Sequence, residues 1–453
     1  MRTSLRPASA VMAVKAAMLL FACAALALPA DNAGGKLVLG PMFGHTTDTS
    51  TTLWLATRVP LPVSATFKAP DGSELTASGE TAQIVEIGGP TTTTIAVGTL
   101  TLSGLKPRTT YAGQVAIDGD ALRLVLNLTT FPAADQPTHL RLALGSGAST
   151  QSDRQQWIWQ AVFDAHPDAL LVLGGSNFLM PGTPNDWEDP ARMAFRAAEL
   201  RGLASIQLAL RSVPYYALWD DRDYGSPDSN KAFPLKGDAL RLFKAFTANP
   251  GYGSDKTEGI WSTFRYGRYQ LLLLDDRSWR DPEDKANGPG KTMLGAAQKT
   301  WLKRTLKAST AKVKVIANGC QMLGSYTSFA SFDKYPDERA ELLAFLDQER
   351  IDGVVFVSGN RQLAELQKLE RPGAYPLYDL TTSPMAAPMT AAGVQEVNPI
   401  RINSTSRSTN FALLDIDDSV PPGTMTFRIN DNQGTQVFSR TIKLDELRYP
   451  AKP

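Results

Sequence analysis

The segment VPYYALWDDRDYG, residues 213–225, decides how this sequence is interpreted, because an apolar run leads directly into a cluster of charges. The run VPYYALW predicts a buried strand, and three aspartates surround one arginine immediately after it. In α/β sheets, ligands bind outside the carboxyl ends of the strands. The segment is therefore a metal site, the remnant of one, or a polar turn, and the rest of the chain has to distinguish these.

Apolar strands alternate with helical segments between residues 140 and 358, which predicts an α/β domain. Ser152 and Gln155 match a capping box, so we expect a helix to begin there. Core strands are predicted within residues 168–175, 214–219, 269–275 and 352–358, and further helices near 188–210, 237–247, 296–309 and 337–349. Six strand ends are polar or rich in glycine, and we expect them to form one shared cleft. They are GSG (145–147), GGSNF (174–178), WDDRDYG (219–225), LDDRSWR (274–280), NGCQ (318–321) and SGNRQ (358–362).

Residues 36–131 show a different pattern of short alternating runs that are rich in threonine and valine. Turn sequences such as APDGS and AIDGD separate these runs at the spacing of an antiparallel β-sandwich. Tyr111 in SGLKPRTTY lies where fibronectin type III-like sandwiches place a corner tyrosine. No aromatic cluster or charge run marks a ligand face, which favours a scaffolding role. A linker with two prolines, residues 131–139, follows the sandwich.

The composition is that of a globular protein, with 43% hydrophobic and 20% charged residues in 453. Beyond residue 30 the chain has 43 basic and 45 acidic side chains. This balance provides no basic field for nucleic acid, so we expect no nucleic-acid partner. The two cysteines, Cys23 and Cys320, are far apart in the sequence, and no disulfide framework is expected.

Residues 1–30 resemble a signal peptide, because basic residues precede the apolar run AAMLLFACAALAL and LPA offers a small residue at a cleavage point. We therefore expect an exported protein, whether periplasmic, cell-surface or extracellular. Cys23 leaves lipoprotein anchoring open, although Phe21 fits the lipid-attachment pattern poorly. No second apolar run is long enough to span a membrane.

Six segments, in this order, resemble the PhoD-like (alkaline phosphatase D) metallophosphatases: GPMFGHTTDTSTTLWLAT (40–57), LKPRTTY (105–111), LWDDRDYG (218–225), LLLLDDRSWR (271–280), LGAAQKTWLKRTL (294–306) and GVVFVSGNRQLAEL (353–366). The resemblance implies a fibronectin type III-like β-sandwich over residues 36–131. It also implies a calcineurin-like metallophosphatase domain of the α/β (α+β) class over residues 138–450. The family hydrolyses phosphoesters with bound metal ions.

The sequence departs from the family at the metal-ligand positions that the resemblance implies, or beside them. Gly147 replaces a cysteine, and Gly175 and Phe178 replace an aspartate and a tyrosine. Arg222 replaces a histidine, while Asn360 and Gln362 replace an aspartate and a histidine. Asp220 and Asp221 remain, which makes them the candidate metal ligands.

Glycine and phenylalanine offer no donor to a metal, and arginine is a permanent cation that repels one. We therefore expect no cofactor. If the site is retained, calcium or magnesium is the ion it would hold, with neutral oxygens from Ser176, Asn177, Asn360 and Gln362 beside Asp220 and Asp221. Arg277 and Arg280 either face the cleft or form ordinary ion pairs. Two hypotheses for Arg222 stay open: it binds an anion, or it forms an internal salt-bridge network with Asp220 and Asp223.

The sequence thus predicts a pseudophosphatase that binds an anionic or phosphorylated small molecule or a cell-envelope component. Its candidate cleft residues are Asp220, Asp221, Arg222, Arg277, Asn360 and Gln362, with Ser176, Asn177 and Arg222 as candidate ligand contacts. The alternative is an active phosphomonoesterase or phosphodiesterase with an altered calcium or magnesium site. A structural role through the sandwich is a third alternative. A serine nucleophile at Ser146 or Ser358 has no local histidine partner.

Overall fold

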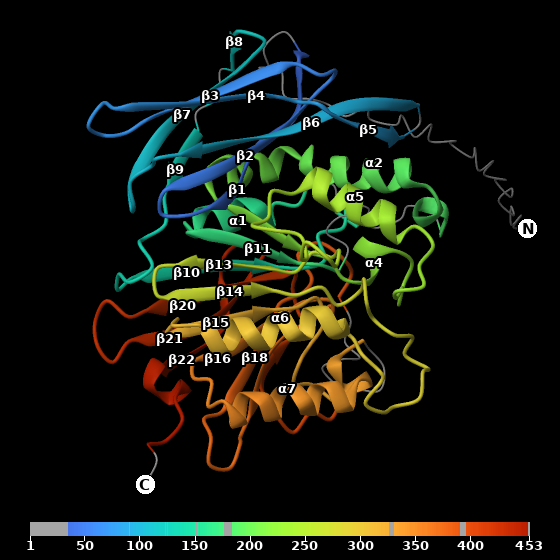
Figure 1. The fold of residues 1–453 in the computed structure, drawn as a ribbon, viewed down its shortest axis with the longest axis vertical. Coiled ribbons are helices and arrows are strands. Elements are labelled where there is room, and N and C mark those ends of the chain that lie inside the picture. The colour runs from blue at the N-terminus through green and yellow to red at the C-terminus, as the bar shows by residue number, and fades with distance from the viewer. Residues whose placement is uncertain are drawn as a thin grey trace, which may run out of the picture.

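The computed structural model describes residues 35–89, 91–122, 124, 126–150, 152–153, 155–175, 184–325, 330–389 and 396–451 (Figure 1). The predicted signal peptide, with Cys23, lies outside the described residues, and so do Ser176, Asn177 and Phe178.

The N-terminal part is the antiparallel β-sandwich that the sequence predicts. One sheet has the strand order β1-β2-β6-β5, and the other has β4-β3-β7-β8 with β9 paired to β7. The corner tyrosine is confirmed, because the Tyr111 hydroxyl accepts a 2.8 Å hydrogen bond from the Lys106 N–H. The strands are β1 (Leu37–Thr46), β2 (Ser50–Thr57), β3 (Pro62–Lys68), β4 (Glu74–Glu80), β5 (Gln83–Gly88), β6 (Thr92–Ser103), β7 (Thr110–Ile117), β8 (Asp120–Ala121) and β9 (Leu126–Thr129).

The rest of the chain forms two packed mixed sheets with helices, in agreement with the predicted α/β (α+β) class. Their strand orders are β12-β11-β10-β20-β21-β22 and β13-β14-β15-β16-β18-β17-β19. The rings of Tyr378 in β18 and Phe427 in β21 stack 5.3 Å apart, so the two sheets share a core.

All four predicted core strands are present. The strands are β10 (His139–Gly145), β11 (Ala169–Leu173), β12 (Tyr215–Leu218), β13 (Ser262–Tyr266), β14 (Tyr269–Leu273), β15 (Val313–Ala317), β16 (Val354–Ser358), β17 (Ala364–Leu369), β18 (Leu377–Thr381), β19 (Arg401–Thr405), β20 (Asn410–Asp417), β21 (Thr424–Asp431) and β22 (Gln436–Lys443).

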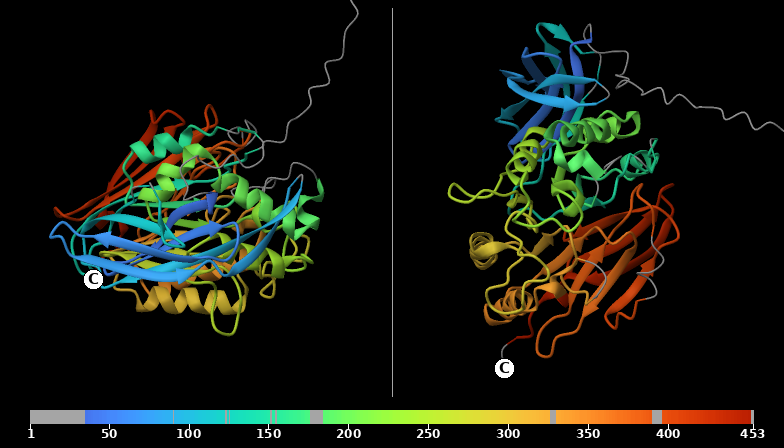
Figure 2. Two further views of the ribbon diagram at one scale, coloured as in Figure 1. Left: turned by 90° about the horizontal axis from the view of Figure 1, so that it is seen from above. Right: turned by 90° about the vertical axis from the view of Figure 1, so that its right-hand side faces the viewer.

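Helices cover both outer faces of the sheet pair. In Figure 1 and in the right-hand view of Figure 2, α6 and α7 lie on the seven-stranded sheet, whereas α2 and α5 lie between the six-stranded sheet and the sandwich. The α-helices are α1 (Ile158–Asp164), α2 (Pro190–Arg201), α3 (Gln207–Ser212), α4 (Asp221–Tyr224), α5 (Lys236–Phe246), α6 (Gly295–Ala308) and α7 (Pro336–Gln348). The 3-10 helices are η2 (Pro184–Glu188), η3 (Ala204–Ile206), η4 (Phe332–Lys334) and η5 (Leu444–Leu447).

The helix that we predicted to begin at Ser152 begins instead at Ile158, so the capping-box prediction is wrong. Gln156 has a φ of 46°, a left-handed conformation that a continuous right-handed helix cannot contain. Its buried side chain explains this turn. The Gln156 amide donates to the Ala148 carbonyl at 3.1 Å and accepts from the Trp159 indole at 2.8 Å.

The sandwich is joined to the sheet pair by a continuous apolar core rather than by a linker alone. The Trp54 indole in β2 donates to the Ala245 carbonyl in α5 at 2.7 Å. A side chain at Gly44 would collide with Ala248, since a Cβ there would lie 2.2 Å from the Ala248 Cβ. This close approach fixes the sandwich against α2, α3 and α5. The carboxyl ends of β11 and β16 are not covered by the sandwich and border a cavity.

Candidate functional site

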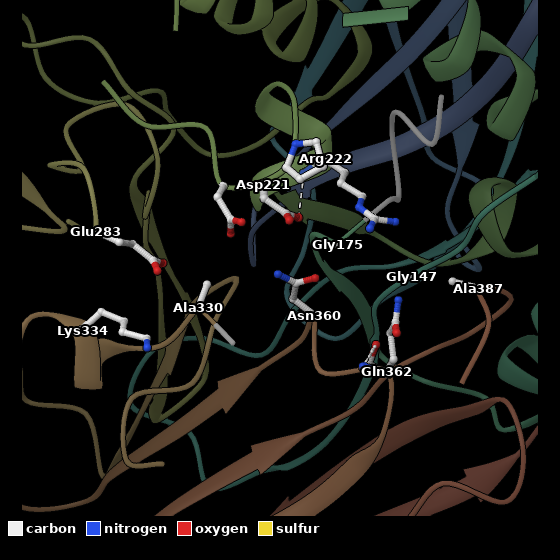
Figure 3. Close-up of a pocket in the computed structure, with 13 residues that line it drawn as sticks. Gly147, Gly175, Asp221, Arg222, Glu283, Ala330, Lys334, Asn360, Gln362 and Ala387 are labelled. Carbon is white, nitrogen blue, oxygen red and sulfur yellow. Dashed lines mark hydrogen bonds between the residues drawn. The ribbon is translucent and has the colours of Figure 1, made fainter. Parts of the chain in front are cut away.

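Strand ends from both sheets meet at one cavity of about 260 Å³ (Figure 3). Strands β10, β11 and β12 are parallel within the first sheet, and β14, β15, β16 and β18 are parallel within the second. Their carboxyl ends therefore lie at common edges. The cavity is lined by Gly147, Gly175, Asp221, Arg222, Pro227, Asp228, Glu283, Ala330, Lys334, Asn360, Gln362, Ser383 and Ala387.

The two candidate metal ligands, Asp220 and Asp221, face different surroundings. Asp221 opens α4 and lines the cavity, where its Oδ1 accepts the Arg222 backbone N–H at 2.7 Å. Asp220 is fully buried and does not line the cavity. Asp220 has an extended backbone and caps α4, whereas Asp221 is the first helical residue, so the two side chains leave the chain in different directions. Only Asp221 is therefore directed at the cavity.

Arg277, which we considered as a cleft residue, is completely buried and binds Asp220. Its Nε lies 2.7 Å from Asp220 Oδ1, its Nη2 contacts the same oxygen, and its Nη1 donates to the Ser229 carbonyl at 3.2 Å. Burial raises the pKa of the Asp220 carboxyl well above its ordinary value, and the Arg277 guanidinium opposes that rise. One oxygen of the Asp220 side chain, Oδ1, is thus bound by a protein cation, whereas Oδ2 is buried and has no hydrogen-bond partner among the described residues.

Asp276 is the second carboxyl beside Arg277, and it was not among the predicted site residues. Its Oδ1 lies 3.7 Å from Arg277 Nε, and its Oδ2 accepts the Cys320 N–H at 3.1 Å. Burial raises the pKa of Asp276, while Arg277 and Arg280 lower it. Cys320 is itself buried, and burial raises the pKa of its thiol well above the usual range. This layer behind the cavity is internal and structural.

Asp275 and Arg280 are also internal. Asp275 accepts hydrogen bonds from the Trp219 indole at 2.8 Å and from the Ser278 hydroxyl at 2.6 Å, which fixes the turn after β14. The fully buried Arg280 contacts Glu283 and lies over the Tyr335 ring at 5.1 Å. Arg280 thereby neutralises Glu283, one of the carboxylates that line the cavity.

Arg222 differs from both buried arginines. It lines the cavity and is half-buried, and within the part of the chain that the structure describes its guanidinium forms no ion pair or hydrogen bond. The Trp187 indole holds only its backbone, by donating to the Arg222 carbonyl at 3.2 Å. The internal network of Asp220, Arg222 and Asp223 is therefore not formed. Asp220 pairs with Arg277, and an Asp223 carboxylate oxygen accepts the Asp220 N–H at 3.1 Å.

Asn360 and Gln362 enter the cavity from the turn after β16, and both have left-handed backbone conformations with φ of 58° and 53°. The Asn360 N–H donates to Ser146 Oγ at 3.0 Å, and the Gln362 N–H donates to Ser383 Oγ at 3.1 Å. Ser146 is fully buried in this role, and Ser358 donates to Asp379 at 2.9 Å. Neither serine contacts a histidine within the described part of the chain, so neither has the arrangement of a nucleophile.

The donor set does not suit a catalytic metal. Across the described ranges, with their gaps, no group of three or more histidine, cysteine, aspartate or glutamate side chains is placed to hold an ion. The positions of Gly147 and Gly175 supply backbone only, with φ of 69° and 74°. Asp221 is a cavity carboxylate, but Asp220 is bound to Arg277. Phosphoesterase metals need several anionic or imidazole ligands.

Sequence reasoning missed part of the cavity wall. Asp228 lies in the loop after α4, Glu283 lies after β14, and Lys334 ends η4. None belongs to a predicted strand end, since long loops bring them to the cavity. Figure 3 shows Glu283 and Lys334 on the side opposite Arg222, with Asp221 and Asn360 between.

Comparisons with known proteins agree with the fold and with the family resemblance. Residues 198–415 match the model of the family described as PhoD-like phosphatase. Alkaline phosphatase D of Bacillus subtilis (strain 168) is 27% identical over a match that covers 36% of this chain. That match spans about a third of the relative, 34% of its length.

Two solved structures share the architecture. The structure of PhoD superposes with a TM-score of 0.71 at 17% identity and covers 92% of both chains. The purple acid phosphatase PPD1 from yellow lupin (Lupinus luteus) seeds gives a TM-score of 0.67 at 12% identity, covering 89% of this chain and 74% of that one. At these identities the two superpositions establish the fold.

Proposed function

We propose that this PhoD-like phosphatase family protein is a pseudophosphatase, which binds an anionic or phosphorylated small ligand without hydrolysing it. The observation that carries the proposal is the cavity at the strand ends. It contains a guanidinium with no protein partner in the described residues, at Arg222, and it lacks a ligand set for a metal. A guanidinium binds phosphate or carboxylate through two parallel hydrogen bonds.

Loss of hydrolysis follows from the chemistry of the missing donors. In a metallophosphatase the ion lowers the pKa of a bound water and stabilises the phosphoryl oxygens. Arginine keeps its proton and cannot generate hydroxide. The site positions at Gly147 and Gly175 have no side chain, and Asp220 is held by Arg277. The residues present therefore do not fit a metal pair, and turnover should be lower by orders of magnitude than in a metal-replete relative.

Binding does not require the metal. Arg222 supplies the cationic fork, and the side-chain amides of Asn360 and Gln362 line the same cavity with N–H donors. The cavity of about 260 Å³ lies just below the roughly 300–1,000 Å³ of pockets for drug-sized ligands, so it suits a ligand smaller than those. Arg222 thus fixes the anionic group, and the amides orient it.

Export is part of the proposal. The apolar N-terminal run supports secretion, and a cell-envelope component is the partner we propose for an exported protein of this kind. None of the described helices is long and apolar enough to cross a membrane. Mass spectrometry of the protein recovered from cells tests this part. A mature chain that begins near Asp31 supports cleavage, an acylated Cys23 would establish lipid anchoring, and an intact Met1 terminus would contradict export.

The test of binding is calorimetric titration of the exported form with inorganic phosphate and with ethyl phosphate. We expect Arg222→Gln to weaken both by about tenfold or more, since hydrogen bonds to charged groups contribute about 1.5–3 kcal/mol. Arg241→Gln is the matched control, because Arg241 is an exposed arginine of α5 paired with Asp238. Equal affinity in Arg222→Gln and wild type would contradict the proposal.

The test of inactivity combines metal analysis with assays on aryl phosphate monoesters and diesters, with iron, calcium, magnesium and zinc each added. Low metal content and negligible turnover are expected. Stoichiometric metal together with turnover that Asp221→Ala abolishes would establish the enzyme instead. Asp221 is the residue to change because its carboxylate, unlike that of Asp220, lines the cavity.

A further inference from the structure

The cavity contains uncompensated charges of both signs. Arg222 has no anionic partner in the described structure, and the carboxylates of Asp221 and Asp228 form no ion pair there either. The other two charged residues of the wall, Glu283 and Lys334, lie on the far side in Figure 3, and Glu283 is already bound by Arg280. The charges without an ion-pair partner in the described residues are therefore a cation at Arg222 and two anions, at the buried Asp221 and at the solvent-exposed Asp228.

A purely anionic ligand suits only half of this arrangement. Its charge would be attracted by Arg222 and repelled by Asp221, the residue next to it in the chain. Asp221 is 8% exposed, so water screens it weakly. A ligand that also carries a positive group would meet complementary charge at both ends, and electrostatic complementarity of this kind selects among ligands.

The acceptors suit an ammonium group better than a metal ion. A primary ammonium has three donors, and Asp221, Asp228 and the Asn360 amide oxygen offer three acceptors on the cavity wall. Calcium normally takes six to eight oxygen ligands with several carboxylates, and the described residues contain no cluster of three acidic, histidine or cysteine ligands. Two carboxylates and an amide are enough for an amine.

We propose that the ligand is a small zwitterion, a phosphorylated primary amine, with its phosphate on Arg222 and its ammonium group between Asp221 and Asp228. The inference rests on the proposed anion binding at Arg222. It adds the cationic end of the ligand and thereby its chemical class.

The test compares O-phosphoethanolamine with ethyl phosphate, which has the phosphate but no amine, by calorimetry at pH 7.5 and constant ionic strength. We expect wild-type protein to bind phosphoethanolamine about tenfold more tightly, the gain from one charge-assisted hydrogen bond. Asp228→Asn should remove most of that advantage. Asparagine tolerates the left-handed backbone of Asp228, whose φ is 60°, so this variant should fold. Asp255→Asn, an exposed aspartate outside the cavity wall, is the control.

The outcomes separate this inference from the proposed function. Equal wild-type affinities for the two ligands, both weakened by Arg222→Gln, would overturn the zwitterion and leave anion binding in place. An amine advantage that survives both Asp228→Asn and Asp221→Asn would overturn the assignment of the ammonium site. The proposed function itself would be overturned if neither ligand bound, or if both ligands bound Arg222→Gln as tightly as wild type.

Discussion

Arg277 and Arg222 both carry a guanidinium group and lie in neighbouring regions, but the protein pairs the first with a carboxylate and leaves the second without a partner among the described residues. Arg277 is fully buried behind the cavity, where it binds Asp220 and the Ser229 carbonyl. Arg222 is half-buried in the cavity wall and has no side-chain partner among the residues described. A buried charge must be compensated by the protein, whereas a charge at a cavity wall can be left for a ligand. The buried layer should therefore govern stability, and the wall should govern binding.

The largest expected effect is on stability, in Arg277→Met. Methionine keeps much of the volume but leaves Asp220 and Asp276 buried without their cation. Breaking a buried pair in this way costs about 3–5 kcal/mol, which should lower the thermal midpoint by several degrees. Arg222→Met should change stability by less than about 0.5 kcal/mol. Equal melting temperatures for the two variants would contradict the distinction between a stabilising buried layer and a cavity wall that does not stabilise the fold. Adding Asp220→Asn to Arg277→Met should restore part of the lost stability, because it removes a buried carboxylate that has no cation.

A second effect on the buried side concerns pH. Burial raises the pKa of Asp379 to about 6, although its carboxylate accepts hydrogen bonds from Ser358 and from the Met322 N–H. The folded protein thus keeps a proton that the unfolded chain loses near pH 4, and the Asp379 contribution to stability falls as pH rises from about 4 to about 6. The change is at most about 3 kcal/mol.

The measurement is thermal or urea unfolding of wild type and Asp379→Asn between pH 4 and pH 7. His45 acts in the opposite direction in the same window, since burial lowers its pKa to about 4 and stability from this group is lost as pH falls below about 6.5. The difference between the two proteins isolates Asp379. That difference should grow in favour of the asparagine variant as pH rises, while ligand affinity stays unchanged. Parallel stability curves would contradict the assignment.

The third effect is smaller and lies at the cavity wall. Arg222→Lys preserves the charge but replaces a planar fork with a point charge, so paired hydrogen bonds to one phosphate are lost. We expect ethyl phosphate to bind several-fold more weakly, a loss of about 1 kcal/mol. Arg241→Lys is the control on the surface of α5. Affinity equal to wild type would show that Arg222 acts through its charge alone.

The sequence predicted the fold more fully than the site because apolar runs report burial directly. The strands at residues 169–173, 215–218, 269–273 and 354–358 are where the apolar runs place them. By contrast, the residue types at positions 220 and 221 are identical, so the sequence cannot predict which of the two carboxylates faces the cavity. That choice depends on where β12 ends and α4 begins, and on the tertiary packing that brings Arg277 to Asp220.

Two other features could not be read from the sequence, for related reasons. Arg277 follows a strand end of the same type as Arg222, and only tertiary packing buries Arg277 completely and leaves Arg222 half-buried at the cavity wall. Asp228 comes to the cavity on a loop without a periodic pattern, and its left-handed backbone is the one local signal, visible only in the structure. Arginine and aspartate occur both in the buried layer and in the cavity wall. The two differ in whether these charges are paired with each other, and that pairing is set by the three-dimensional structure.

The smallest expected effect is on metal binding, in a double variant that adds two possible metal ligands to the cavity wall. Arg222→His with Gln362→His restores two imidazoles at positions that the family resemblance assigns to histidine, beside the carboxylate of Asp221. We still expect no stoichiometric iron, zinc or calcium by elemental analysis and no phosphatase activity. Gly147 and Gly175 contribute no donors, and adding side chains there is strained, because both have left-handed φ and a Cβ at Gly175 would lie 3.0 Å from Ser146 Oγ. The double variant should lose the binding of ethyl phosphate that depends on Arg222, which serves as the internal control that the cavity was altered. Tight metal binding with turnover in this variant would mean that the wall needs only two changes to become catalytic, and the separation between a structural layer and a purely ligand-binding wall would no longer hold.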